Sequence, residues 1–120
     1  MSHIVTVKTQ LKNTVSIAKA CKRLEWQCEE KGVGVFYNGS SVEGCVVRPT
    51  GWRYPAVIKD SEILSDTYNG AWGKDSDLDR LKKYYAVEET KSTLAAQGIY
   101  SREYLDEKDQ SITLVAEVHN

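Results

Sequence analysis

The sequence predicts an α+β domain in which two helices pack on one face of an antiparallel sheet, in a ferredoxin-like arrangement. Three patterns predict it: alternation near the start, two helical patterns set among short β-rich segments, and a closing hairpin pattern. Helices distributed among hairpin-linked strands are typical of this class. A length of 120 residues predicts a single domain over residues 1–120.

The spacing of apolar residues changes from every second residue to helical spacing near the start of the chain, which predicts a strand followed by a helix. The stretch "HIVTVKTQ" alternates and is rich in β-branched residues, which predicts a strand. In "KNTVSIAKACKRLEW", either Asn13 or Thr14 suits the N-cap of a helix. Ile17, Cys21 and Leu24 then recur at helical spacing, so we expect them on the buried face.

The middle of the chain predicts short strands joined by turns. The stretch "KGVGVFYNGSS" has three glycines and an Asn-Gly pair, which favours a hairpin or a loop. "GCVVRP" and "PAVIKD" predict two strands, and "SEILSDTY" suits a third. "RPTGWRYPAVI" contains the connection between the first two, with Pro49 and Pro55 limiting its backbone freedom.

The second helix has both a start signal and a stop signal. Ser76 followed by Asp79 predicts a capping box, and the chain then has no helix breaker until Gly98, which suits a C-terminal cap. Leu78, Leu81 and Tyr85 form one apolar stripe.

The last segments predict a hairpin with one covered face. "IYSREYLDE" leads through "KDQ" to "SITLVAEV". The last strand places four apolar side chains on one face, namely Ile112, Leu114, Ala116 and Val118.

Composition and charge exclude several function classes. Apolar residues make up 41% and charged residues 28%, as in ordinary globular domains. The net charge of −1 gives no general attraction to nucleic acid or anionic membranes, so long nucleic acid is disfavoured and no membrane partner is expected. Three cysteines, with neither a signal-peptide pattern nor a membrane-length apolar run, predict a cytoplasmic protein with reduced thiols.

The patterns that could suggest catalysis or metal binding have simpler interpretations. The His and Cys residues lack the short spacing that lets two zinc ligands come from one turn of the chain, so we expect no metal and no cofactor. Cys21 is better explained as a small core residue. Pairs of carboxylates lie at helix starts and turns, where solvent stabilises their charge. Since no group of residues meets the requirements of an active site, we expect no enzymatic activity.

The strongest candidate site is a set of aromatic and basic residues. Arginine binds phosphate through two parallel hydrogen bonds, and flat rings stack on bases. The alternative is that Trp52 and Trp72 close the edge of the core while the arginines are solvated. The candidate ligand-binding residues are Arg48, Trp52, Arg53, Tyr54, Tyr68, Trp72, Arg80 and Tyr84.

Four segments resemble a known family. "MSHIVTVKTQL", "LEW", "LDRLKKYYAVEETKSTLAAQGIYS" and "SITLVAEV" are similar to the plastid and cyanobacterial ycf thirty-five-like family, a domain of unknown function. Between Lys31 and Gly73 the chain departs from that pattern beyond "VVR", "YPAVIKD" and "AWG". His3 lies in the matching opening and joins the candidate ligand-binding residues on that ground.

The resemblance implies a small stand-alone protein rather than a known enzyme, and it supplies no catalytic residues. Family members occur in plastids, bacteria and tailed phages, often near genes for AAA-type ATPases. The implied location is the plastid stroma or a host cytoplasm.

Two hypotheses follow. The first is a non-enzymatic module that sequesters a small anionic or nucleotide-like ligand, for which a viral anti-defence sponge is one setting. The second is a protein-interaction accessory factor, for example an adaptor to an AAA-type ATPase, with the aromatic residues as interface anchors. In either case the open edges of an antiparallel sheet favour a homo-oligomer.

Overall fold

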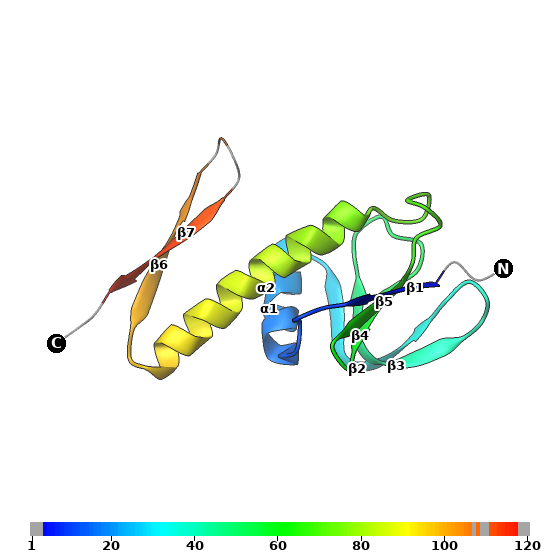
Figure 1. Ribbon diagram of the computed structural model, residues 1–120, viewed down its shortest axis with the longest axis horizontal. Helices are drawn as coiled ribbons and strands as arrows, with labels where there is room; N and C mark the ends of the chain where they lie inside the picture. Colours follow the sequence, from blue (N-terminus) through cyan, green and yellow to red (C-terminus); the bar gives the residue numbers. More distant parts are fainter. Residues whose placement is uncertain (1–3, 107, 109–110, 118–120) are drawn as a thin grey trace. The chain divides into compact units, whose positions relative to one another are not determined.

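A computed structural model describes residues 4–106, 108 and 111–117 (Figure 1). The chain forms two compact units, Met1–Tyr85 and Ala86–Asn120. The length-based expectation of a single domain stays a prediction, because a compact unit is not by itself an independently folding domain. The elements are β1 (Ile4–Lys8), α1 (Thr14–Leu24), β2 (Gln27–Val35), β3 (Ser41–Arg48), β4 (Ala56–Lys59), β5 (Glu62–Asp66), α2 (Asp75–Ala96), β6 (Tyr100–Leu105) and β7 (Ile112–Glu117).

The first unit is built on a five-stranded antiparallel sheet of order β1-β5-β4-β3-β2. Strands β2 to β5 follow one another as a meander, and β1 pairs with β5 from Ile4↔Asp66 to Lys8↔Glu62. The predicted α+β class with an antiparallel sheet is confirmed. The narrower ferredoxin-like arrangement is not confirmed, because the sheet has five strands and β6 and β7 form a separate two-stranded sheet.

Helix α1 begins and ends where local chemistry dictates. The side chain of Asn13 accepts a 3.0 Å hydrogen bond from the backbone N–H of Val15, which satisfies one free donor of the first turn. Glu25 takes a left-handed conformation with φ of 62° and closes the helix. The predicted inward face is confirmed, since Ile17, Cys21 and Leu24 are buried.

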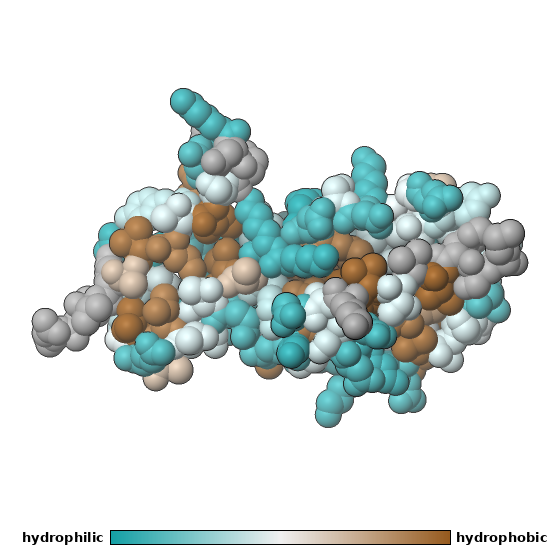
Figure 2. Space-filling view, in the orientation of Figure 1, coloured by the Kyte–Doolittle hydropathy of each residue, from teal (hydrophilic) through white to brown (hydrophobic). Residues whose placement is uncertain are grey.

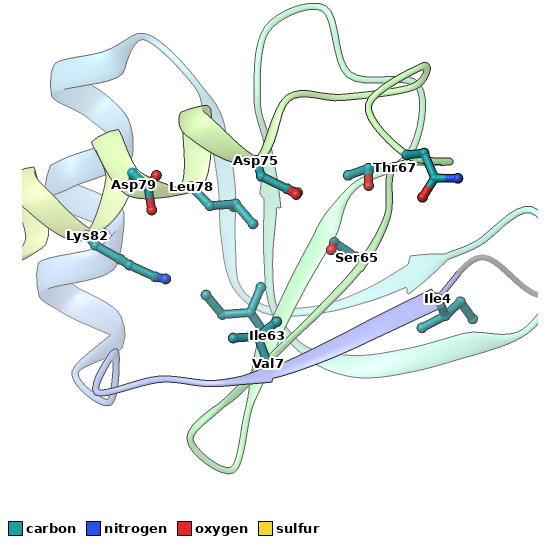
Figure 3. A pocket seen from close by; sticks show the side chains of 10 residues that line it. Ile4, Val7, Ile63, Ser65, Thr67, Asp75, Leu78, Asp79 and Lys82 are labelled. Atoms are coloured by element: carbon teal, nitrogen blue, oxygen red, sulfur yellow. The ribbon is translucent and has the colours of Figure 1, made fainter.

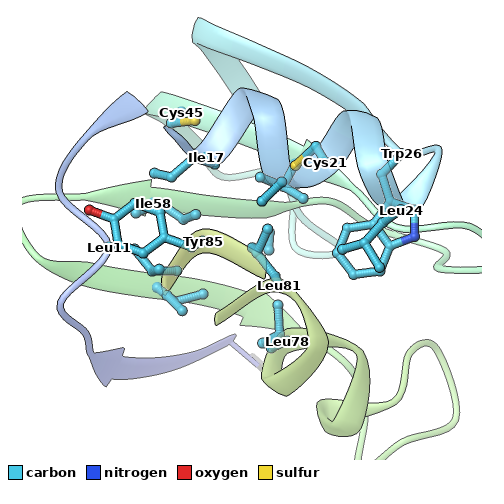
Figure 4. Packing of buried hydrophobic residues seen from close by; sticks show 14 residues of the cluster. Leu11, Ile17, Cys21, Leu24, Trp26, Cys45, Ile58, Leu78, Leu81 and Tyr85 are labelled. Carbon is cyan, nitrogen blue, oxygen red and sulfur yellow. The ribbon is translucent and has the colours of Figure 1, made fainter. Parts of the chain in front are cut away.

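Both helices contribute to the main core on the same face of the sheet (Figure 4). Strands β3, β4 and β5 supply Cys45, Val47, Ala56, Ile58 and Ile63, and α1 covers them with its inward face. Helix α2 adds the predicted stripe of Leu78, Leu81 and Tyr85, all buried. The sheet therefore presents every second residue of its strands to the helices.

The opposite face of the sheet has its own small core. Phe36, Val46 and Val57 are buried together there. The far end of the β2–β3 hairpin curls over this face: a Cβ on Gly34 would meet the side chain of Val57. The backbone N–H of Tyr37 then donates a 3.0 Å hydrogen bond to Oδ2 of Asp66, at the end of β5. Of the two alternatives predicted for "KGVGVFYNGSS", a hairpin or a loop, the structure shows the hairpin, which is anchored to the sheet.

Helix α2 starts one residue before its predicted cap. It begins at Asp75, so Ser76 lies inside the first turn and the predicted capping-box role is wrong. The acidic residues of this turn suit the positive end of the helix dipole. The predicted C-terminal cap is confirmed: Gly98 has φ of 75°, and the N–H of Ile99 bonds to the carbonyl of Leu94 at 2.9 Å.

The second unit ends in the predicted hairpin, with β6 and β7 paired from Tyr100↔Glu117 to Leu105↔Ile112. The expected covered face is not found among its described side chains. Ile112 and Leu114 are half-buried and Ala116 is exposed, while Val118 lies outside the described residues. Figure 2 likewise shows apolar groups at the surface of the hairpin. No helix of the described chain is long and apolar enough to span a membrane.

Candidate functional site

Two loops of the first unit build the candidate site. One joins β3 to β4 over residues 49–55, and the other joins β5 to α2 over residues 67–74. The backbone N–H of Arg53 donates a 2.9 Å hydrogen bond to the carbonyl of Trp72, which ties the loops together. Within the second loop, the carbonyl of Thr67 accepts from the N–H groups of Gly70 and Trp72. Both loops are therefore held in defined conformations.

Four aromatic rings and one guanidinium gather on these loops and the β2–β3 hairpin tip. We call this group, Tyr37, Arg53, Tyr54, Tyr68 and Trp72, the aromatic face. Trp72 is its centre: its ring centroid lies 4.9 Å from Tyr68, 5.0 Å from Tyr37 and 5.2 Å from Tyr54. The Tyr68 pair is stacked, and the other two are inclined. Ring pairs of this kind stabilise a fold by about 0.5–1.5 kcal/mol each.

The cation of the aromatic face belongs to Arg53. Its guanidinium carbon lies 5.3 Å from the centroid of Trp72 and 5.9 Å from that of Tyr54, within the range of cation–π attraction. Tyr37 is 54% exposed and Tyr68 46% exposed, while Tyr54 and Trp72 are half-buried. The face thus presents apolar ring surface and a positive charge to solvent, instead of closing the core.

Trp52 behaves differently from Trp72. Its indole packs against the main core and over Gly73, where an added Cβ would lie 2.5 Å from the ring. Its N–H donates a 2.8 Å hydrogen bond to Oδ2 of Asp77. The interpretation that a tryptophan closes the edge of the core therefore holds for Trp52, whereas Trp72 is the residue that centres the aromatic face.

The other predicted residues make separate contacts. Arg48 pairs with Glu29 across β2 and β3 at 4.0 Å. Arg80 pairs with Asp77 on α2 at 3.7 Å. His3 lies outside the described residues.

Tyr84 packs against the main core. The guanidinium of Arg23 on α1 lies over its ring, at 4.9 Å from the centroid. Of the nine predicted residues, Arg53, Tyr54, Tyr68 and Trp72 are brought together.

Tyr37 is the member of the aromatic face that sequence reasoning missed. It lies immediately before the Asn38-Gly39 turn, where the local sequence does not indicate which distant residues the ring contacts. Its position follows from the curl of the hairpin and from the hydrogen bond to Asp66. An aromatic residue beside an Asn-Gly turn was the one available signal.

A separate cavity of about 400 Å³ lies between β1, β5 and the start of α2 (Figure 3). Ile4, Val7, Ile63 and Leu78 form its apolar part. Its polar lining comes from Ser65, Thr67, Asn69, Asp75, Asp79 and Lys82. None of the predicted site residues is among these described lining residues. The sequence pattern indicates solvent-exposed charges for the carboxylates at the start of the second helix and therefore does not predict a cavity there.

Metal ligation has no support within residues 4–106, 108 and 111–117, where no three His, Cys, Asp or Glu side chains are arranged to hold an ion. Asp77, beside Trp52, serves as a hydrogen-bond acceptor and ion-pair partner.

Comparison with known proteins adds no relative to this description. No protein-family model, no curated protein and no solved structure matches the chain. The likeness to the ycf thirty-five-like family therefore stays a prediction.

Proposed function

We propose that this protein is a non-enzymatic binding module that holds its partner on the aromatic face. The observation that carries the proposal is the arrangement around Trp72, with three tyrosine rings and the Arg53 guanidinium packed about one indole at the surface. When a partner covers exposed ring surface of this kind, apolar area is removed from water, which lowers the free energy of the complex. The loops that present it are tied by backbone hydrogen bonds, so little ordering is needed on binding.

The exposure and the residue types of the aromatic face favour a protein partner. Small-molecule sites are concave and enclose most of their ligand. The described cavities are lined by other residues, among which no member of the aromatic face occurs. Trp, Tyr and Arg are the residues that dominate binding energy in protein interfaces, where they lie near the centre of the contact. An accessory or adaptor role is the function that fits best.

A small anionic ligand with a flat ring is the second candidate, and Arg53 is the observation that favours it. The guanidinium lies over two rings and is exposed, so an anionic group could bind beside a ring stacked on Tyr68 or Tyr37. A nucleotide-like molecule has both features.

Location and assembly belong to the same proposal. We infer a cytoplasmic protein, in line with its three free thiols. The edge strands β1 and β2 support a homo-oligomer, because each leaves one side of the sheet available for pairing.

Quantitative affinity capture from host extract tests the proposal. The three baits are wild type, the double variant Arg53→Gln with Tyr68→Ala, and the control Tyr104→Ala, which removes a tyrosine of β6 that is also exposed. We expect one partner to be retained by wild type and control and lost with the double variant, while far-ultraviolet circular dichroism shows that the double variant is still folded at the temperature of the capture. Retention of that partner by the double variant would contradict the proposal.

Calorimetric titration with mononucleotides and cyclic nucleotides tests the second candidate on the same three proteins. Binding by wild type and Tyr104→Ala, with loss in the double variant, supports the small ligand. Equal heats in all three proteins reject the aromatic face as its site.

A further inference from the structure

Three cysteine thiols from three elements lie in or against the main core. Cys21 comes from α1, Cys28 from β2 and Cys45 from β3, and all are free thiols. The Sγ atoms of Cys28 and Cys45 are 3.8 Å apart, and the thiol of Cys21 interacts with Cys28 strongly enough to shift the pKa of both groups. Figure 4 shows Cys21 and Cys45 among the core residues. The binding role of the aromatic face does not use this group.

The register of the sheet explains why two of these thiols meet. Cys28 pairs with Val47, and Cys45 lies two residues from Val47 on the same face of β3. Diagonal neighbours on one face of an antiparallel pair lie about 7–8 Å apart, and here the two side chains bring their sulfurs to 3.8 Å from each other. The ladder shifts register between Glu29 and Gly32, immediately after Cys28. An irregular ladder there allows the local backbone to adjust.

The three thiols differ in access. Cys21 is 0% exposed and Cys45 is 2% exposed. Cys28 is half-buried at the margin of the core. A small solute therefore reaches Cys28 first.

They also differ in acidity. Hydrogen bonds from Cys21 and then from Cys45 lower the pKa of Cys28, and they outweigh its partial desolvation. The same bonds, together with burial, raise the pKa of Cys21 and of Cys45. The thiolate is the reactive form of cysteine, so the negative charge lies on the most accessible sulfur.

We propose that Cys28 and Cys45 are a redox-active thiol pair, in which Cys28 is oxidised by a peroxide and Cys45 resolves it as a disulfide. The Cys28 thiolate attacks one oxygen of the peroxide, the O–O bond breaks, and hydroxide leaves while a sulfenic acid forms. The Cys45 thiol then attacks the Cys28 sulfur: the S–S bond forms as the S–O bond of the sulfenic acid breaks, and the leaving hydroxyl takes the Cys45 proton and departs as water. Two thiols are oxidised and one peroxide is reduced. A dithiol reverses the bond by exchange.

Distance favours Cys45 as the resolving residue. A disulfide needs the sulfurs at about 2.05 Å, so the Cys28–Cys45 pair must close from 3.8 Å. Both residues lie on adjacent strands beside the register shift. Cys21 is held on the inward face of α1 by its neighbours in the core.

Peptide mapping of the full-length wild-type protein tests the pair without any variant. Trypsin cuts after Lys19, Lys22, Arg23 and Lys31, and Pro49 protects Arg48 from cleavage. Each cysteine is thus isolated in its own peptide, in residues 20–22, 24–31 and 32–53. The protein is treated with hydrogen peroxide, quenched with iodoacetamide and digested without reductant.

We expect peptide 24–31 linked to peptide 32–53, a monomer lighter by two hydrogen atoms, and reversal by dithiothreitol. A link to peptide 20–22, or a link between chains, overturns Cys45 as the resolving residue. Unmodified Cys28, under conditions that oxidise free glutathione, overturns the whole proposal.

Two variants assign the roles. In Cys45→Ala we expect loss of the disulfide and trapping of Cys28 by dimedone, which reacts with sulfenic acids. Cys21→Ala, a matched removal of the other buried thiol, should keep the disulfide. Absence of a dimedone adduct in folded Cys45→Ala, judged by circular dichroism, overturns Cys28 as the first site of oxidation.

Discussion

The indole N–H of Trp52 donates a 2.8 Å hydrogen bond to Oδ2 of Asp77 and so fastens the β3–β4 loop to the first turn of α2. The acceptor is a carboxylate at the positive end of the helix dipole. We expect Trp52→Phe, which keeps most of the ring surface, to lower the free energy of unfolding by about 1–2 kcal/mol. Urea denaturation measures it, in a double-mutant cycle with Asp77→Ala. Additive effects of the two substitutions would show that the bond contributes nothing.

Gly73 is required because the Trp52 ring lies directly over it. A Cβ on Gly73 would sit 2.5 Å from the indole, so Gly73→Ala forces the ring or the loop to move. Overpacking of this kind costs about 1–3 kcal/mol. The same substitution in a Trp52→Ala background should cost less, because the obstructing ring is gone. Equal losses of stability in both backgrounds would refute the steric explanation.

Asp66 anchors the hairpin that carries Tyr37. Its carboxylate is 1% exposed, and Oδ2 accepts the N–H of Tyr37 at 3.0 Å. Asp66→Ala should lower stability by about 1.5–3 kcal/mol, as expected for a bond to a charged group. It should also change the near-ultraviolet circular dichroism of the aromatic face.

Asp66→Asn provides the matched comparison, since it keeps an oxygen acceptor and removes the buried charge. Among the described residues, Oδ1 of Asp66 has no hydrogen-bond partner. We therefore expect Asp66→Asn to be the milder change. Glu43→Ala removes an exposed carboxylate of β3 as a control. A larger loss in Asp66→Asn than in Asp66→Ala would contradict the anchoring role.

The hydroxyl of Tyr85 links α2 to the start of α1. It accepts the N–H groups of Lys12 and Asn13, at 3.2 Å and 3.1 Å. Tyr85→Phe leaves these partly buried donors without that acceptor and should cost about 1–2 kcal/mol in thermal or urea unfolding. Tyr104→Phe, at an exposed position of β6, should have almost no effect. A neutral Tyr85→Phe would mean that water replaces the hydroxyl.

Cys28 should be alkylated with an unusual pH dependence. Because hydrogen bonds from Cys21 and Cys45 lower the pKa of Cys28, its thiolate persists as pH falls below the usual thiol range. The hydrogen bond with Cys28 is the main cause that raises the pKa of Cys45, and the charge of Glu30 contributes least to this rise. The rate of iodoacetamide labelling of peptide 24–31 should reach its plateau below the ordinary thiol pKa, and Cys45→Ala should move the midpoint upward. An ordinary midpoint in wild type would contradict the cluster's effect.

Local patterns predicted the elements whose residues repeat at a regular period. Ile17, Cys21 and Leu24 identify α1 because one helical face is buried there, and Gly98 ends α2 by its left-handed conformation. The length of β2 escaped prediction because its charged residues and glycines interrupt alternation. Only pairing with β3, across a register shift, makes that segment a strand.

The candidate site was less predictable than the fold because long-range contacts assemble it. Tyr54 and Trp72 are on different loops and meet through the Arg53–Trp72 hydrogen bond. Tyr37 joins them from a third segment through Asp66. Composition around residue 50 pointed to the right loop but could not separate Trp52, which packs on the core, from Trp72.

The pairing of β1 with β5 has a consequence for synthesis. The first strand finds its partner only at residues 62–66, so it stays unpaired while the intervening chain is made. The β2–β5 meander can form from near neighbours, and loop-closure entropy then makes docking of β1 the slower event. Until it docks, β5 exposes an open edge that can pair with another nascent chain. Crowded translation of this protein should therefore favour domain-swapped products in which β1 is exchanged.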